Sequence, residues 1–143
     1  MLAGQPVLSD SARQPLFEPL PPASVFTGCG CTFSTRPDSA GSEAAVLFSS
    51  DYKGSARIAS RGAVIQLLAD RPDTDCRPSR VGSRCILKYR SSDARVVIKA
   101  RATWVCPADD TSESCEVVRL GGRMAGGADD LEESVEVNGE CGC

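Results

Sequence analysis

Hydrophobic and polar residues alternate along much of the chain after residue 23, and the clearest alternation covers residues 94–106. The two faces of this segment are Val96, Ile98, Ala100, Ala102, Trp104 and Cys106 on one side and Arg95, Val97, Lys99, Arg101 and Thr103 on the other. A period of two is typical of a half-buried β-strand. We therefore expect one long strand here, with Trp104 and Cys106 on its buried face.

The segment Arg84–Arg90 alternates in the same way, and the turn-forming residues Ser91, Ser92 and Asp93 connect it to the long strand. The two segments together predict a β-hairpin. Further candidate strands are residues 44–49, 55–60, 63–69, 114–120 and 134–138. Seven or eight short antiparallel strands predict an all-β domain. Our first expectation is a small OB-like barrel, and a two-sheet β-sandwich is the alternative.

Glycine and proline mark the parts of the chain that do not fit this pattern. Residues 1–23 contain five of the nine prolines: Pro6, Pro15, Pro19, Pro21 and Pro22. Since proline lacks a backbone N–H, this segment is expected to be an extended arm. Its apolar residues are available to dock on the domain: Val7, Leu8, Leu16, Phe17 and Leu20. A single disulfide-stapled β-domain is expected over residues 24–143, with an acidic loop at residues 129–133 that follows the glycine pairs at 121–122 and 126–127.

The chain contains eight cysteines, an even number, as full pairing in disulfides requires. This number is high for a protein of the reducing cytosol. Cys76 and Cys85 have eight residues between them, and so do Cys106 and Cys115. Both intervening segments are rich in turn residues, and Cys106 and Cys115 lie near the base of a predicted hairpin. Cross-strand Cβ atoms at such a place are close enough to bridge. We expect the local disulfides Cys76–Cys85 and Cys106–Cys115.

The remaining four cysteines form two Cys-Gly-Cys motifs, Cys29–Cys31 and Cys141–Cys143. Residues i and i+2 of a strand are about 7 Å apart, which is at the upper limit for a disulfide. We therefore expect bonds between the two motifs, with the connectivity left open. The alternative is a zinc or copper site, because four thiolates can surround either metal. The Cys-x-Cys spacing differs from the Cys-x₂-Cys of zinc ribbons.

The net charge of −3 is the difference between two opposed regions. Residues 53–101 hold twelve basic and four acidic residues, whereas residues 109–143 hold two basic and ten acidic residues. On the predicted hairpin the basic side chains share the polar face: Arg84, Lys88, Arg90, Arg95, Lys99 and Arg101. This face is a candidate site for a polyanion such as a phosphorylated glycan or lipid headgroups. Nucleic acid is disfavoured, because Tyr89 and Trp104 are assigned to the apolar face and leave no stacking platform.

The chain contains no histidine, which excludes Ser-His-Asp triads and histidine metal ligands. No arrangement of carboxylates replaces them, so we expect no enzyme and no cofactor. Cysteine content, together with thirteen arginines against three lysines, favours an exported bacterial protein, periplasmic or secreted. The chain has no apolar stretch long enough to span a membrane and no signal peptide, so we expect the native signal peptide to be absent from it. The expected function is a non-catalytic binding or structural module for a protein or small ligand. The alternatives are the thiolate metal site and polyanion binding.

Overall fold

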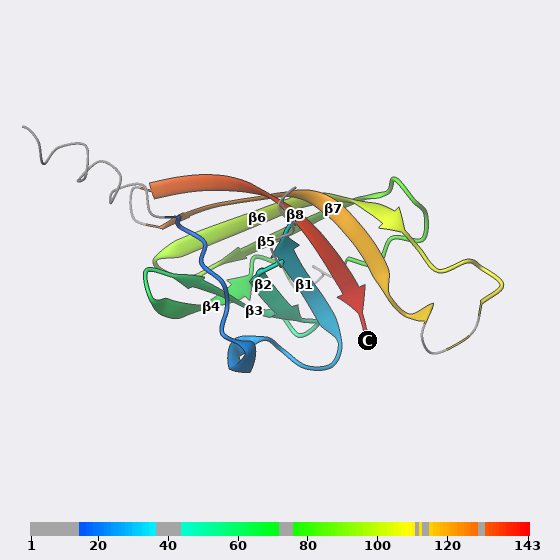
Figure 1. Ribbon diagram of the computed structural model, residues 1–143, viewed down its shortest axis with the longest axis horizontal. Helices are drawn as coiled ribbons and strands as arrows, with labels where there is room; N and C mark the ends of the chain where they lie inside the picture. Colours follow the sequence, from blue (N-terminus) through cyan, green and yellow to red (C-terminus); the bar gives the residue numbers. More distant parts are fainter. Residues whose placement is uncertain (1–14, 37–43, 72–75, 111, 113–114, 129–130) are drawn as a thin grey trace, which may run out of the picture.

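The computed structural model describes residues 15–36, 44–71, 76–110, 112, 115–128 and 131–143. Eight antiparallel strands follow one another around a closed barrel, and β1 pairs with β8 to close it (Figure 1). The strands are β1 Gly30–Thr35, β2 Val46–Asp51, β3 Ser55–Ser60, β4 Ala63–Ala69, β5 Arg84–Arg90, β6 Ala94–Trp104, β7 Val118–Ala128 and β8 Leu131–Gly142. A short 3₁₀ helix, η2 Pro22–Ser24, precedes them. The predicted all-β antiparallel fold is confirmed, and it takes the barrel form.

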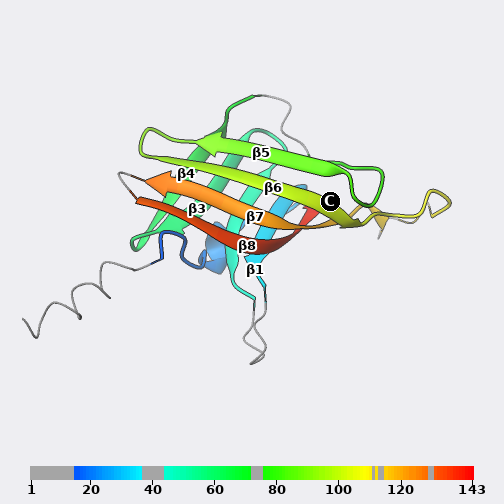
Figure 2. The same cartoon turned by 90° about the horizontal axis from the view of Figure 1, so that it is seen from above.

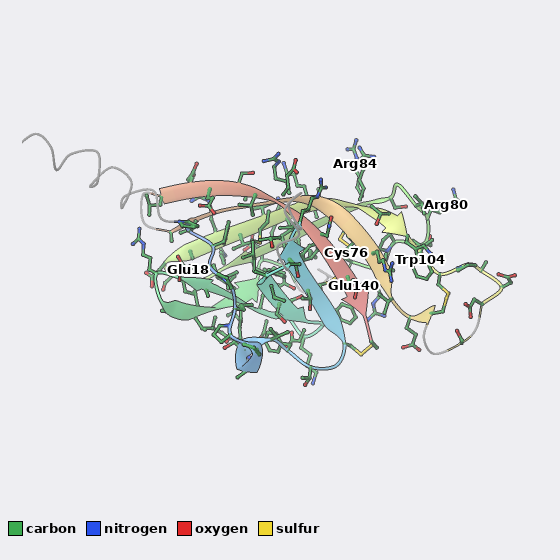
Figure 3. All side chains as sticks on the ribbon, in the orientation of Figure 1. Glu18, Cys76, Arg80, Arg84, Trp104 and Glu140 are labelled. Atoms are coloured by element: carbon green, nitrogen blue, oxygen red, sulfur yellow. A yellow bond between two sulfur atoms is a disulfide. The ribbon has the colours of Figure 1, made fainter. Side chains whose placement is uncertain are left out.

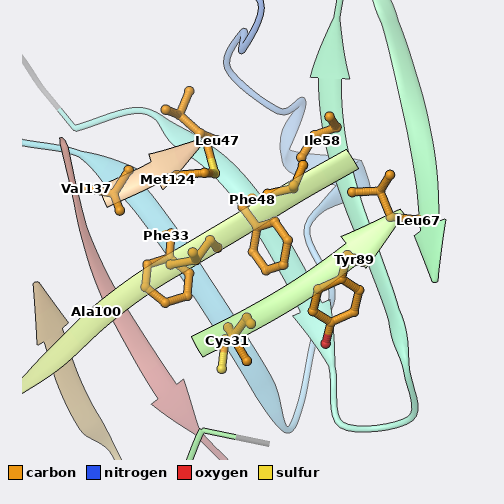
Figure 4. Packing of buried hydrophobic residues seen from close by; sticks show 14 of the residues in the cluster. Cys31, Phe33, Leu47, Phe48, Ile58, Leu67, Tyr89, Ala100, Met124 and Val137 are labelled. Atoms are coloured by element: carbon orange, nitrogen blue, oxygen red, sulfur yellow. The ribbon is translucent and has the colours of Figure 1, made fainter. Parts of the chain in front are cut away.

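The predicted hairpin is the pair β5–β6, joined by Ser91–Asp93, and its alternation is reproduced residue by residue up to Ala102. Figure 2 shows β5, β6, β7 and β8 side by side as one broad layer. The inward side chains of all strands meet in one core. In that core Phe48 makes edge-to-face contacts with Phe33 and Tyr89, with ring centroids 5.9 and 5.4 Å apart (Figure 4). Such contacts add to the stabilisation from apolar burial.

Strand β7 continues past the end of the strand expected at residues 114–120. It runs through Gly121, Gly122, Gly126 and Gly127 and pairs with β6 and β8. A Cβ at Gly122 would lie 2.1 Å from the carbonyl oxygen of Lys99, so only glycine allows β6 and β7 to approach this closely. Gly122 therefore serves close packing within a strand.

The acidic loop expected at residues 129–133 is only partly within the described residues. The expectation was wrong for Leu131, Glu132 and Glu133, which belong to β8. Asp129 and Asp130 lie outside the described residues.

The segment before η2 is hydrogen-bonded to β2 and β3 and contributes to the core. Leu16, Phe17 and Leu20 are buried. Backbone hydrogen bonds hold the segment in place: the N–H of Glu18 donates to the carbonyl of Ala59 at 2.9 Å, and that of Leu20 donates to Val46 at 2.8 Å. Three of the five apolar residues expected to dock thus belong to the core, while Val7 and Leu8 lie outside the described residues.

Trp104 departs from the predicted alternation. The β6–β7 register shifts between Ala102 and Trp104, so that one residue more is accommodated on β6. After this bulge both Thr103 and Trp104 are exposed, and Val105 packs against the core in their place. The expectation of a buried Trp104 was wrong, as was that of Cys106 on the buried face, because Cys106 lies beyond the end of the strand and is only half-buried.

Candidate functional site

All eight cysteines are paired, which confirms the prediction of disulfide bonds. The pairs are Cys29–Cys143, Cys31–Cys141, Cys76–Cys85 and Cys106–Cys115. The first two join the Cys-Gly-Cys motifs to each other, whereas the last two are local. The Cys76–Cys85 bond is buried among the core residues.

The two bonds between the motifs lie two residues apart along the seam that closes the barrel, with the pair Gly30 and Gly142 between them. Cys31 of β1 is directly opposite Cys141 of β8, and the Cα atoms of each bonded pair are 4.0 Å apart. Cys31 and Cys141 point into the core and are buried, whereas Cys29 and Cys143 are exposed at the end of the barrel. Residues i and i+2 of a strand share a face, so an antiparallel seam brings the two motifs together in this order.

This pairing uses the four sulfur atoms that the metal hypothesis requires. A thiolate site at Cys29, Cys31, Cys141 and Cys143 would need both seam bonds to be reduced. Cys106, Asp110 and Cys115 also come together, with ligand atoms within 4.8 Å of one another, but their two sulfurs are bonded. Hydrogen bonds from the hydroxyl and the backbone N–H of Ser112 lower the pKa of the Asp110 carboxyl. The same bonds connect this carboxyl to a residue of its own loop.

The six basic side chains predicted for the polar face of the hairpin all lie exposed on the outside of β5 and β6. Two of them have carboxylate partners: Arg90 pairs with Asp70 at 3.1 Å, and Arg95 pairs with Glu132 of β8. The other four have no carboxylate partner in the described part of the chain, and they are Arg84, Lys88, Lys99 and Arg101. Figure 3 shows Arg84 pointing away from the barrel.

Two of these unpaired cations line a depression on the outer surface of β6, β7 and β8, which we call the cationic depression. It has a volume of about 330 Å³, and its charged residues are Arg36, Lys99, Arg101, Arg123 and Glu136. Its floor is the pair Gly121 and Gly122. The Glu136 carboxylate binds Arg36 at 3.3 Å and Arg123 at 3.4 Å, which leaves Lys99 and Arg101 without a counter-ion.

A second depression, which we call the polar depression, lies beside the first. It has a volume of about 490 Å³ and is lined chiefly by polar side chains: Thr32, Ser34, Thr103, Asn138, Arg119 and Glu140. The Nε of Arg119 pairs with Glu140 at 3.5 Å, and its guanidinium carbon lies 5.8 Å from the centre of the Trp104 ring.

Sequence reasoning found the β5–β6 cations but missed the other residues of both depressions. Arg123 and Asn138 come from β7 and β8, which follow β6 in the sheet, whereas Arg36 follows β1 and reaches this surface because β1 pairs with β8. The alternation of Gly121 and Arg123 was a usable signal, but the expected strand ended at residue 120.

Comparisons with protein families, with curated proteins and with solved structures found no match to this chain. No helix in the described part of the chain is long and apolar enough to cross a membrane. The chemistry of the surface itself is therefore the basis for a functional assignment.

Proposed function

We propose that this chain is a non-catalytic binding module of an exported protein, and that its ligand is a polyanion held on the outer surface of β6, β7 and β8. The observation that carries the proposal is the cationic depression. Four cations and one carboxylate line it, so it carries three positive charges in excess. Its floor is formed by Gly121 and Gly122. Unpaired cations that converge on one concave surface attract anions strongly.

The acidic strand β8 does not cancel this charge. Its four carboxylates are all engaged: Arg95 pairs with Glu132, Arg123 with Glu136 and Arg119 with Glu140, while Glu133 accepts a hydrogen bond from the backbone N–H of Leu16. Strand β7 stands between β8 and the remaining cations of the hairpin. Glu136 is the only acidic residue in the described lining of the cationic depression, and Arg36 and Arg123 share it.

Two further observations support the rest of the proposal. Four disulfides are typical of an oxidising compartment, so they favour export. A chain without histidine lacks the most common general acid and base, and the two depressions hold only ion-paired carboxylates. Binding of an anion by fixed cations needs neither a cofactor nor a metal.

The proposal is tested by retention on heparin–agarose in a salt gradient. The variant Lys99→Gln/Arg101→Gln removes the two unpaired cations of the cationic depression. We expect it to elute at clearly lower salt and to bind heparin about tenfold more weakly in solution, because fewer counterions are released on binding.

The matched control is Arg90→Gln/Arg95→Gln, which removes two cations from the same hairpin that already have carboxylate partners. Its affinity should stay within about twofold of the parent chain. The proposal is overturned if the parent chain shows no salt-dependent retention, or if both double variants lose the same affinity.

A further inference from the structure

We infer that the polyanion is an acidic glycan that lies across both depressions, with its acid groups on Lys99 and Arg101 and its hydroxyl groups in the polar depression. This inference rests on the proposed function and names its ligand class. Three features support it that the binding of an anion alone does not require. They are the polar depression, the exposed Trp104 and Gly121, which lies between the depressions.

Gly121 connects the two depressions. A Cβ placed on it would lie 3.4 Å from Cγ2 of Thr103 and 3.8 Å from Oδ1 of Asn138, both in the polar depression. The same Cβ would lie 3.7 Å from a guanidinium nitrogen of Arg36, in the cationic depression. Because residue 121 has no side chain, no wall stands between the cations and the neutral polar groups. An elongated ligand can therefore contact both.

The polar depression is equipped for hydroxyl groups. Thr32, Ser34 and Thr103 supply hydroxyls and Asn138 supplies an amide, each of which can donate and accept a hydrogen bond. The side chains of these four residues have no hydrogen-bond partner among the residues that the structure describes. Sugar hydroxyls also donate and accept, so they match this lining better than phosphate oxygens, which only accept.

Trp104 stands at the edge of the polar depression. It is 40% exposed, it lies opposite Arg119 in the β6–β7 register, and Arg119 itself lines the depression. The face of an indole ring packs well against the C–H groups of a pyranose, and the ring pairs this apolar surface with a polar edge. The bulge that exposes Trp104 therefore adds a sugar-binding surface to a row of hydrogen-bonding groups.

The same observations argue against a nucleic acid. Single-stranded binding surfaces stack successive bases on several aromatic side chains. Of the seven aromatic residues in the chain, only Trp104 is exposed. Phe26 and Tyr52 are half-buried and each is covered by an arginine, with guanidinium-to-ring distances of 4.2 and 4.4 Å. A single exposed aromatic ring can pack against one sugar ring, whereas a run of bases needs several such rings.

Trp104 is the only tryptophan, so its fluorescence reports on this surface directly. The probes are a heparin hexasaccharide, an oligothymidylate of equal charge, inorganic polyphosphate and neutral maltohexaose. We expect the hexasaccharide to change the emission saturably and to bind at least about tenfold more tightly than the oligothymidylate or polyphosphate. Maltohexaose should bind weakly, because it lacks the acid groups.

Two variants of β7 test the role of the polar depression. Gly121→Thr places a branched side chain between the depressions and removes no cation, and it should weaken hexasaccharide binding about tenfold. Ala125→Thr makes a comparable change on the same exposed face of the same strand, four residues away, and should leave binding unchanged. Circular dichroism and thermal melts of both variants confirm that the barrel is intact.

The outcomes separate the inference from the proposed function. If all three anionic probes bind equally and Gly121→Thr has no effect, the glycan inference fails while polyanion binding stands. If the oligothymidylate binds more tightly than the hexasaccharide, a nucleic acid replaces the glycan. If no anionic probe binds, both proposals fail.

Discussion

Gly30 and Gly142, the central residues of the two Cys-Gly-Cys motifs, lie where neighbouring backbone comes very close. A Cβ at Gly30 would be 1.9 Å from the carbonyl oxygen of Ser50, and one at Gly142 would be 2.2 Å from that of Glu116. Neither oxygen belongs to a flexible side chain, so the backbone itself would have to move. Glycine between the cysteines is thus required by the approach of β2 to Gly30 and of the segment before β7 to Gly142.

Replacing Gly30 by alanine should therefore destabilise the barrel by about 2–3 kcal/mol, the usual cost of overpacking a rigid site. Guanidinium unfolding with the disulfides intact measures the change. Gly121→Ala is the control, since its Cβ would make only ordinary contacts of 3.4 Å or more. That variant should stay within about 1 kcal/mol of the parent chain. Equal losses in the two variants would show that close approach at Gly30 is not the cause.

At the scale of single elements, strands with clean alternation were predictable from the sequence and the others were not. The β5–β6 hairpin has one apolar and one charged face, and each of its six basic residues points outward as expected. Strand β7 was only partly found, because glycine in a sequence usually marks a turn. Glycines in β7 and β8 face side chains and backbone of other segments, such as Lys99 against Gly122 in β7 and Phe33 against Gly139 in β8, which only the folded barrel reveals.

The docked segment before η2 is a second element whose contribution can be measured. Phe17 is 4% exposed, and its ring occupies the space left by the missing side chain of Gly126, where a Cβ would lie 2.5 Å from Cζ. Phe17→Ala leaves a cavity in this contact and should lower the free energy of unfolding by about 3 kcal/mol.

Phe26→Ala is the matched control for that measurement. Phe26 is half-buried, and its main side-chain contact is the guanidinium of Arg57. Its loss should cost about 1 kcal/mol. If Phe17→Ala costs no more than Phe26→Ala, the segment at residues 15–20 lies on the barrel without stabilising it.

For the whole molecule, barrel closure explains which part of the candidate site the sequence could indicate. Lys99 and Arg101 follow from the alternation of one strand. Arg36 and Asn138 lie far from them in the sequence and reach them through the pairing of β1 with β8 and of β8 with β7. The exposure of Trp104 depends on a bulge whose position no local pattern marks. A local reading of the sequence therefore identifies the cations but not the depressions that they line.

Closure also predicts that the two seam disulfides stabilise the barrel redundantly. The bonds Cys29–Cys143 and Cys31–Cys141 close rings of nearly the same size, with sequence separations of 114 and 110. Removing the exposed bond by Cys29→Ser/Cys143→Ser should therefore cost less than about 1 kcal/mol, because the other ring remains. Adding Cys31→Ala/Cys141→Ala should bring the total loss to at least about 4 kcal/mol.

Chemical unfolding of the three forms measures this coupling. The pair Cys106→Ser/Cys115→Ser provides the comparison, because it opens a separate loop with a sequence separation of 9. Its cost should add to that of either seam variant within about 0.5 kcal/mol. Simple additivity of the two seam bonds would contradict the redundancy.

The bond between Cys29 and Cys143 also decides where tension would travel if the polypeptide were stretched. A load applied at Gly28 and at Cys143 would pass directly through the two sulfur atoms, because they connect these points by the shortest covalent path. Residues 30–142, which include every strand of the barrel, lie outside this covalent path and carry none of the force. A ligand on β6 would therefore stay bound to an undistorted surface under a pull that would unzip an unbridged barrel.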